Sequence, residues 1–521
     1  MSVFRLGIDQ LTVGKLNQLL SKASTAVIDE QAVARIRQSK AHVDAIVSAE
    51  KVVYGINTGF GPLCTEIISA DDTRQLQENI LRSHSVGVGE AVPLEVARIM
   101  MITKLHALCR GYSGISLEVL QRILWLFEQD YIPFVPIQGS VGASGDLAPL
   151  AHLFLPLIGL GRLYDGNDYI ETAKIHQREE VEPLELGAKE GLALINGTQF
   201  IVAYAALGMS RMHTLLETAD IIGAMSLEGI LGSESPFDPG LHELRPFTGA
   251  QQVAHRLKKL LDNSEMVASH ENCGRVQDPY SIRCMPQVHG SSRHAWLHLS
   301  EMLKIELNAV TDNPVIFSAE KTISGGNFHG QPLALPLDYA TLGAAELGNI
   351  SDRRSYLLIE GNAGLPRLLM TNTGINSGFM IPQYTSAALV SENKSLCFPA
   401  SADSIPTSLG QEDHVSMGSI SGRKLNQVLD NLENILAVEL VSAAQAFDYR
   451  KPMKSGPILD ACHELVREKI DHAEEDRVFA HDIAKAAALI KSGALVECAN
   501  QTAQMKNIDF KGPHYELYRL H

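Results

Sequence analysis

Cysteine, long apolar runs and positive charge are all scarce in this sequence. The seven cysteines are too few and too irregularly spaced for a disulfide framework in 521 residues, which fits a reducing compartment. An apolar run at residues 147–160 is interrupted by Pro149, His152 and Pro156, so it does not predict a membrane span. Acidic side chains outnumber basic ones by 60 to 44, and the net charge of -16 disfavours nucleic acid and anionic membranes as partners. We therefore expect a cytoplasmic protein that acts on a small molecule.

Metal binding has one weak signal in the sequence. The spacing of two histidines and two cysteines loosely resembles a zinc site at His270, Cys273, Cys284 and His289. Such a match arises easily by chance in a chain with 19 histidines. We therefore expect no metal site.

Helical periodicity dominates the sequence after residue 200. Apolar residues recur at three- and four-residue steps from Leu425 to Leu440, and again from Trp296 to Val310, where Asp312-Asn313-Pro314 is expected to stop the helix. Strand patterns are short and scattered. We predict a mainly α protein with a central bundle of long helices. An N-terminal, loop-rich domain is expected at residues 1–200, followed by a helical-bundle domain with C-terminal helices at residues 201–521.

The glycine-rich segment at residues 139–150, GSVGASGDLAPL, has the clearest chemical meaning. Such a turn can hold a phosphate on backbone N–H groups, so a non-catalytic or phosphate-binding protein is one alternative. However, the segment lacks the Lys-Ser/Thr ending of a P-loop. In a tightly bent backbone, the Gly145 nitrogen can instead attack the Ala143 carbonyl with loss of water. Dehydration of Ser144 then leaves a methylidene, which is a strong electrophile, and Asp146 is a candidate to assist the proton transfers.

This segment resembles the signature of the aromatic amino acid ammonia-lyases, which carry a methylidene-imidazolone (MIO) group at Ala-Ser-Gly. The resemblance extends over most of the chain, through YGINTGFG at 54–61, SVGASGDL at 140–147, EGLALINGT at 190–198, GGNFH at 325–329 and QEDHVSM at 411–417. It implies an MIO formed autocatalytically from Ala143-Ser144-Gly145, with no dissociable cofactor. It also implies a homotetramer with shared active sites, in which Tyr54 and Ser144 come from different chains.

The resemblance implies a role for several further residues. Tyr54 matches the family's acid/base, which takes the β-proton of the substrate. Arg283 is suited to hold the substrate carboxylate in its planar fork, and Tyr280 would share its face if the segment is helical. Further substrate- or MIO-contacting positions match Asn196, Gln277 and Phe328.

The choice of substrate depends on the residues that contact its ring. Ser83-His84 resembles the histidase pattern, although some tyrosine lyases share it. Glu412, preceded by Gln411, can accept the N–H of an imidazole, whereas beside a benzene ring it would be an unpaired, desolvated charge. We therefore expect deamination of L-histidine to trans-urocanate, with tyrosine ammonia-lyase activity as the alternative.

Overall fold

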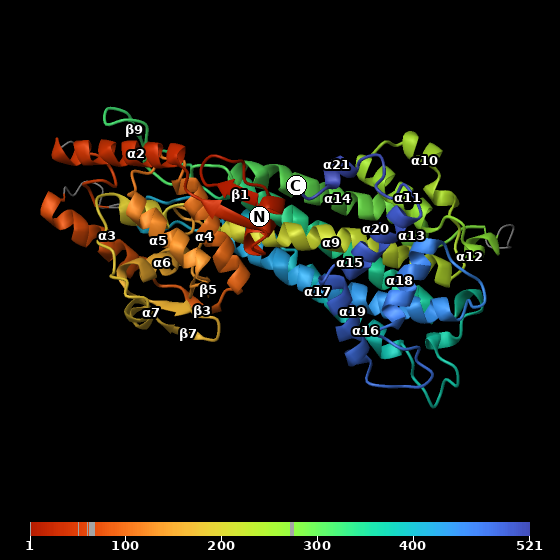
Figure 1. The fold of residues 1–521 in the computed structure, drawn as a ribbon. Coiled ribbons are helices and arrows are strands. Elements are labelled where there is room, and N and C mark those ends of the chain that lie inside the picture. Colours follow the sequence, from red (N-terminus) through yellow and green to blue (C-terminus); the bar gives the residue numbers. More distant parts are fainter. Residues whose placement is uncertain (1, 50–51, 60, 62–67, 271–275) are drawn as a thin grey trace.

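The computed structural model describes residues 2–49, 52–59, 61, 68–270 and 276–521, and shows an elongated, mainly helical molecule (Figure 1). Its N-terminal half consists of short helices and small sheets: β1 (Ser2–Arg5), α1 (Val13–Leu20), β2 (Ser24–Val27), α2 (Glu30–Ser48), α3 (Ala70–His84), β3 (Val88–Ala91), α4 (Leu94–Leu108), α5 (Leu117–Glu128), β4 (Ile132–Pro133), β5 (Pro136–Gln138), α6 (Leu147–Phe154), β6 (Arg162–Tyr164), β7 (Tyr169–Glu171), α7 (Thr172–Arg178) and α8 (Glu190–Ile195). The small sheets pair β1 with β2, β3 with β5, and β6 with both β4 and β7.

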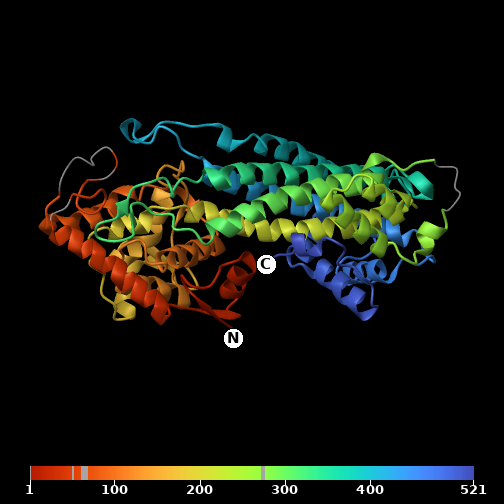
Figure 2. The same ribbon diagram turned by 90° about the horizontal axis from the view of Figure 1, so that it is seen from above.

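The rest of the chain is built around four long helices, α9 (Gln199–Gly229), α14 (Met285–Glu306), α15 (Gln331–Ile359) and α17 (Gly418–Asp448), which pack side by side (Figure 2). Shorter elements surround them: α10 (Pro239–Glu243), α11 (Thr248–Leu260), α12 (Glu265–Ala268), α13 (Tyr280–Arg283), β8 (Val315–Ile316), β9 (Thr322–Ile323), α16 (Met380–Leu396), α18 (Pro457–Arg467), α19 (Phe479–Lys491), α20 (Ala494–Met505) and α21 (Tyr515–Tyr518). The prediction of a mainly α protein with a central helical bundle is confirmed.

The long helices form where the apolar periodicity predicts them. In α17 the residues from Leu425 to Leu440 that recur at three- and four-residue steps are all buried. α14 ends at Glu306, earlier than the predicted stop at Asp312-Asn313-Pro314. The segment that follows α14 is not helical. Within it, buried Asp312 forms an ion pair of 2.7 Å with buried Lys189.

The boundary proposed at residue 200 falls inside α9, and one continuous apolar core contains buried residues from both sides of it, such as Leu105 and Leu436. The division into two domains stays a proposal. None of the described helices combines the length and apolar character needed to span a bilayer.

Candidate active site

The Ala143-Ser144-Gly145 tripeptide lies in a turn whose backbone is strained. Ser144 has a φ of 51°, and Gly142 and Gly145 both have a φ of 79°, in the left-handed region that favours glycine. Gly145 also lies directly against Gly197, because a Cβ atom on Gly145 would come within 2.1 Å of the Gly197 carbonyl oxygen. Only glycine fits at position 145, and the three left-handed residues hold the tripeptide in a tight bend.

Segments far away in the sequence hold this turn in place. Asn196, at the end of α8, donates from Nδ2 to the Ser144 carbonyl oxygen at 2.7 Å. The start of α17 contributes two further bonds, from the Met417 amide to the Val141 carbonyl at 3.0 Å and from the Ser419 hydroxyl to the Ser140 carbonyl at 2.7 Å. The turn is therefore fixed by the N-terminal half and the helical bundle together.

Asp146, next to the tripeptide, is fully buried at the N-terminus of α9. Its carboxylate accepts hydrogen bonds from the Phe200 and Ile201 amides at 3.1 and 3.0 Å and from the Ser140 hydroxyl at 2.9 Å. Burial raises the pKa of Asp146 to about 7, although these hydrogen bonds act in the opposite direction. A carboxyl group with such a pKa can both hold and release a proton near neutral pH.

Lys104 is a contributor that the sequence analysis missed. Its side chain is buried on α4, and Nζ donates to the Asn196 carbonyl oxygen at 2.5 Å. Burial lowers the pKa of Lys104 to about 7, while Asp312 acts against this shift. Lys104 therefore supports the residue that contacts the Ser144 carbonyl. The signal was present, because a single lysine among the apolar residues of 94–108 is unusual on a buried helix.

A cavity of about 760 Å³ opens beside Ser144 and gathers seven of the predicted site residues, namely Tyr54, His84, Ser144, Asn196, Phe328, Gln411 and Glu412. They come from positions between 54 and 412 of a single chain. The expectation that Tyr54 and Ser144 come from different chains was therefore wrong, because both line this one cavity.

Glu412 contacts the tripeptide directly. Its Oε1 accepts a hydrogen bond of 2.7 Å from the Ser144 hydroxyl, and its Oε2 accepts bonds from the Thr407 and Ser408 hydroxyls at 3.0 and 2.6 Å. These two hydroxyls were not predicted, although they precede Glu412 in the same loop. Burial lowers the pKa of His84, and the charge of Glu412 opposes this effect. The His84 imidazole and the Glu412 carboxylate therefore interact electrostatically beside the Ser144 turn.

Tyr54 and Asn196 present polar groups to the same cavity. The Tyr54 phenol oxygen accepts a hydrogen bond of 3.3 Å from the Gly61 amide. The Asn196 Oδ1 atom is buried and has no hydrogen-bond partner among the described residues. It is therefore a free acceptor beside the Ser144 carbonyl.

Gln277, Tyr280 and Arg283 lie apart from this cavity. Gln277 and Arg283 line a different one, of about 790 Å³, together with residues such as Lys258 and Gln287. Tyr280 and Arg283 share the single turn of α13, with the Arg283 guanidinium 4.6 Å from the Tyr280 ring centre. Tyr280 is 72% exposed, and the buried Nε of Arg283 lacks a hydrogen-bond partner in the described part of the chain. One chain alone does not bring these three residues to Ser144.

The zinc-like pattern is not gathered by the described part of the chain. His289 is buried and bonded to the Asp220 carboxylate at 2.9 Å, and Cys273 lies outside the described residues. Among the described residues there is no group of three or more histidine, cysteine or acidic side chains placed to hold a metal ion.

Comparison with known proteins gives one consistent result. Residues 11–468 match the model of the family described as aromatic amino acid lyase. The chain is 47% identical to a histidine ammonia-lyase of Stigmatella aurantiaca, over 95% of this chain and 98% of that protein. It also resembles the crystal structure of histidine ammonia-lyase from Trypanosoma cruzi, with 42% identity, a TM-score of 0.90 and coverage of 99% and 97% of the two chains. A tyrosine aminomutase from Streptomyces globisporus is similar at 32% identity, with a TM-score of 0.91 and coverage of 96% and 99%.

Proposed function

The chain belongs to the aromatic amino acid lyase family, and from this membership we infer that it removes ammonia from L-histidine to give trans-urocanate. The curated relatives at 43–47% identity over nearly the whole chain are named histidine ammonia-lyase. Within the site, the observation that supports this substrate best is the Glu412 carboxylate, 2.7 Å from the Ser144 hydroxyl and electrostatically coupled to His84. A charged acceptor at this point suits an imidazole N–H and does not suit an apolar ring.

The residues present fit an MIO group formed from Ala143, Ser144 and Gly145. The left-handed turn brings the tripeptide into the bend that cyclisation needs, and the glycine at 145 leaves its nitrogen unobstructed. Asp146, with a pKa of about 7, is positioned to move protons during ring closure. Once formed, the group supplies an electrophile for the amine of the substrate.

The remaining residues bind the substrate and move its protons. Tyr54 is proposed to take the β-proton. Asn196 polarises the Ser144 carbonyl through Nδ2, and its free Oδ1 is available to the substrate amine. Phe328 forms part of the cavity wall. Gln411 also lines the cavity, next to Glu412.

The substrate carboxylate needs a cation, and none of the described residues that line the cavity is an arginine or a lysine. We propose that Arg283, with Tyr280 and Gln277, reaches the site from another copy of the chain in a homotetramer. The unpartnered Nε of Arg283 and the exposed ring of Tyr280 support this arrangement. The cytoplasmic location stays a prediction.

An apolar stripe on α15 and α16 supports self-association. Side chains on these helices that remain about half exposed are Leu335, Tyr339, Leu342, Tyr356, Ile381 and Tyr384. On α15 they recur at steps of four, three and fourteen residues, which places them on one face of the helix. A stripe of this length on a single chain is typical of a protein–protein interface.

Aspartate at Tyr339 and Leu342 together is expected to dissociate the tetramer, because two charges would be buried without partners in the interface. Light scattering after size exclusion measures the change in mass, and turnover of histidine should fall with it because Arg283 no longer reaches the site. Val3→Asp, at a comparably exposed apolar residue on β1, should leave both properties unchanged. A double variant that stays tetrameric would contradict the proposed interface.

Glu412→Gln is expected to lower kcat/KM for histidine by about 10- to 100-fold, because a hydrogen bond to a charged group is replaced by a neutral one. Any activity on tyrosine should change much less, since a phenol ring does not need the charge. Ultraviolet absorbance distinguishes the two products in the same assay, urocanate from histidine and coumarate from tyrosine. Asp403→Asn, in the same loop but outside the cavity, is the matched control. Equal losses on both substrates would exclude the assigned role and favour a tyrosine ammonia-lyase.

A further inference from the structure

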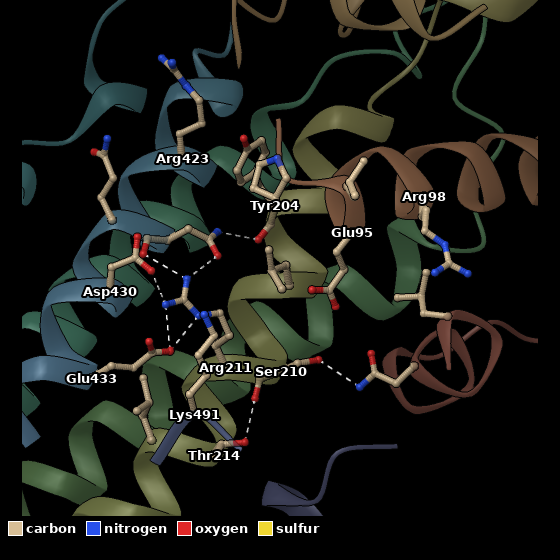
Figure 3. Close-up of a pocket in the computed structure, with 18 of the residues that line it drawn as sticks. Glu95, Arg98, Tyr204, Ser210, Arg211, Thr214, Arg423, Asp430, Glu433 and Lys491 are labelled. Carbon is tan, nitrogen blue, oxygen red and sulfur yellow. Dashed lines mark hydrogen bonds and ion pairs between the residues drawn. The ribbon is translucent and has the colours of Figure 1, made fainter. Parts of the chain in front are cut away.

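A third cavity, of about 840 Å³, lies between the N-terminal half and the C-terminal helices (Figure 3). Its walls come from α1, α4, β5, α9, α17 and α19, and the aliphatic part consists of Leu20, Leu94, Ile137, Leu207, Leu215 and Ile490. None of the predicted active-site residues lines it, and neither α15 nor α16 contributes to it. It is therefore separate from both the candidate active site and the proposed interface.

The Tyr204 hydroxyl in this cavity is buried and has no hydrogen-bond partner among the residues that the structure describes. Tyr204 is only 3% exposed, and its ring is held by Phe200, with 5.0 Å between the ring centres, and by the backbone of Gly422. A buried hydroxyl without a partner destabilises the folded state, because it has given up its hydrogen bond to water. Burial raises the pKa of Tyr204 to about 12, so the group remains an O–H donor.

Arg423 is the second donor without an acceptor. Its Nε is buried and unpartnered, and no carboxylate of the described residues forms an ion pair with it. Arg211 in the same cavity shows the contrast, because Glu433 and Asp430 hold its guanidinium at 2.9 and 2.5 Å. Figure 3 shows Arg423 extending away from this cluster. Of the three arginines that line the cavity, Arg98 and Arg211 are thus neutralised by acidic partners, whereas Arg423 is not.

The charges around the cavity indicate which anion would fit. Two donors, one neutral and one positive, match the two oxygens of a carboxylate. Three carboxylates, of Glu95, Asp430 and Glu433, and four cations, of Arg98, Arg211, Arg423 and Lys491, line the cavity. Their net charge of +1 matches a singly charged anion better than a doubly charged phosphate. The aliphatic wall favours a ligand with an apolar body.

We propose that this cavity binds a small organic carboxylate, whose oxygens accept hydrogen bonds from Tyr204 and Arg423 while its apolar body packs on the aliphatic wall. The two donors lie within the first two turns of α9 and α17, the helices whose starts flank the Ser144 turn. A bound carboxylate connects these helices to α1, α4 and α19.

Titration calorimetry with 3-phenylpropanoate tests the proposal on the full-length protein. The protein used carries Arg283→Met. This change removes the arginine proposed to bind the substrate carboxylate, so that binding at the active site does not contribute to the measured heat. One site per chain is expected. Tyr204→Phe and Arg423→Met should each weaken binding about tenfold or more, because each removes a hydrogen bond to a charged group. Lys491→Met, which removes an exposed charge at the edge of the same cavity, should change the affinity by less than about threefold.

Three results would overturn the proposal. They are the absence of binding, affinities that neither Tyr204→Phe nor Arg423→Met changes, and equally tight binding of inorganic phosphate. Tyr204→Phe removes a single oxygen atom, so thermal melting should show that it folds normally. A crystal structure with the probe bound should place the carboxylate within hydrogen-bond distance of the Tyr204 hydroxyl, and a position elsewhere would equally exclude the assignment. None of these measurements depends on histidine turnover.

Discussion

Alanine in place of Ser144 is expected to lower the turnover of histidine by about 1000-fold or more, which corresponds to roughly 4 kcal/mol of lost transition-state stabilisation. The variant has no hydroxyl to eliminate, so the methylidene cannot form. Alanine occupies the left-handed conformation about as readily as serine does, and the hydrogen bond lost to Glu412 lies in a half-buried part of the cavity. The fold should therefore be retained, as thermal melting would show.

Intact mass provides the direct readout for Ser144→Ala. The parent protein is expected to be lighter than its sequence by two water molecules, whereas the variant should not show this full loss. Ser408→Ala is the matched control, because it removes another hydroxyl bonded to Glu412 and leaves the tripeptide unchanged. Parent-like turnover by Ser144→Ala, or a parent protein of unmodified mass, is incompatible with the proposed electrophile.

Phenylalanine in place of Tyr54 is expected to lower turnover by about 100- to 10,000-fold, the range that general base catalysis contributes. The change removes only the oxygen that accepts a hydrogen bond from the Gly61 amide. Because the tripeptide is untouched, the loss of two waters should persist, which separates this variant from Ser144→Ala. The affinity for substrate should change little, since the ring remains in the cavity wall.

A tyrosine outside the cavity provides the control for this second variant. Tyr112 contacts Phe317 at 5.8 Å between ring centres and does not line the cavity. Tyr112→Phe should keep the parent rate. If Tyr54→Phe also keeps it, another group removes the β-proton and the assignment of Tyr54 is incorrect.

The sequence predicted the parts of the site that carry a local signature. The spacing of small residues around Ser144 indicated a bent, reactive turn, and the apolar steps after Arg423 predicted α17. The motif matches indicated the family, which the comparison confirmed. These features were accessible because local residues determine backbone bending and helical periodicity.

Other parts of the site depend on contacts between distant segments. No local pattern relates Lys104 to Asn196, although the two meet at 2.5 Å. The buried ion pair between Asp312 and Lys189 likewise joins residues that are 123 positions apart in the sequence. The position of Arg283 outside the cavity of its own chain follows from the overall arrangement of the helices, which a linear motif does not encode.

The anchoring of the reactive turn has a consequence for how the protein matures. The bonds that fix residues 140–144 come from Asn196 and from Met417 and Ser419. A growing chain on the ribosome lacks some of the hydrogen bonds that hold the tripeptide until the segment near residue 419 has been synthesised and folded. The proposed ring closure is therefore expected to follow folding, and newly made protein is expected to pass through a folded but inactive stage.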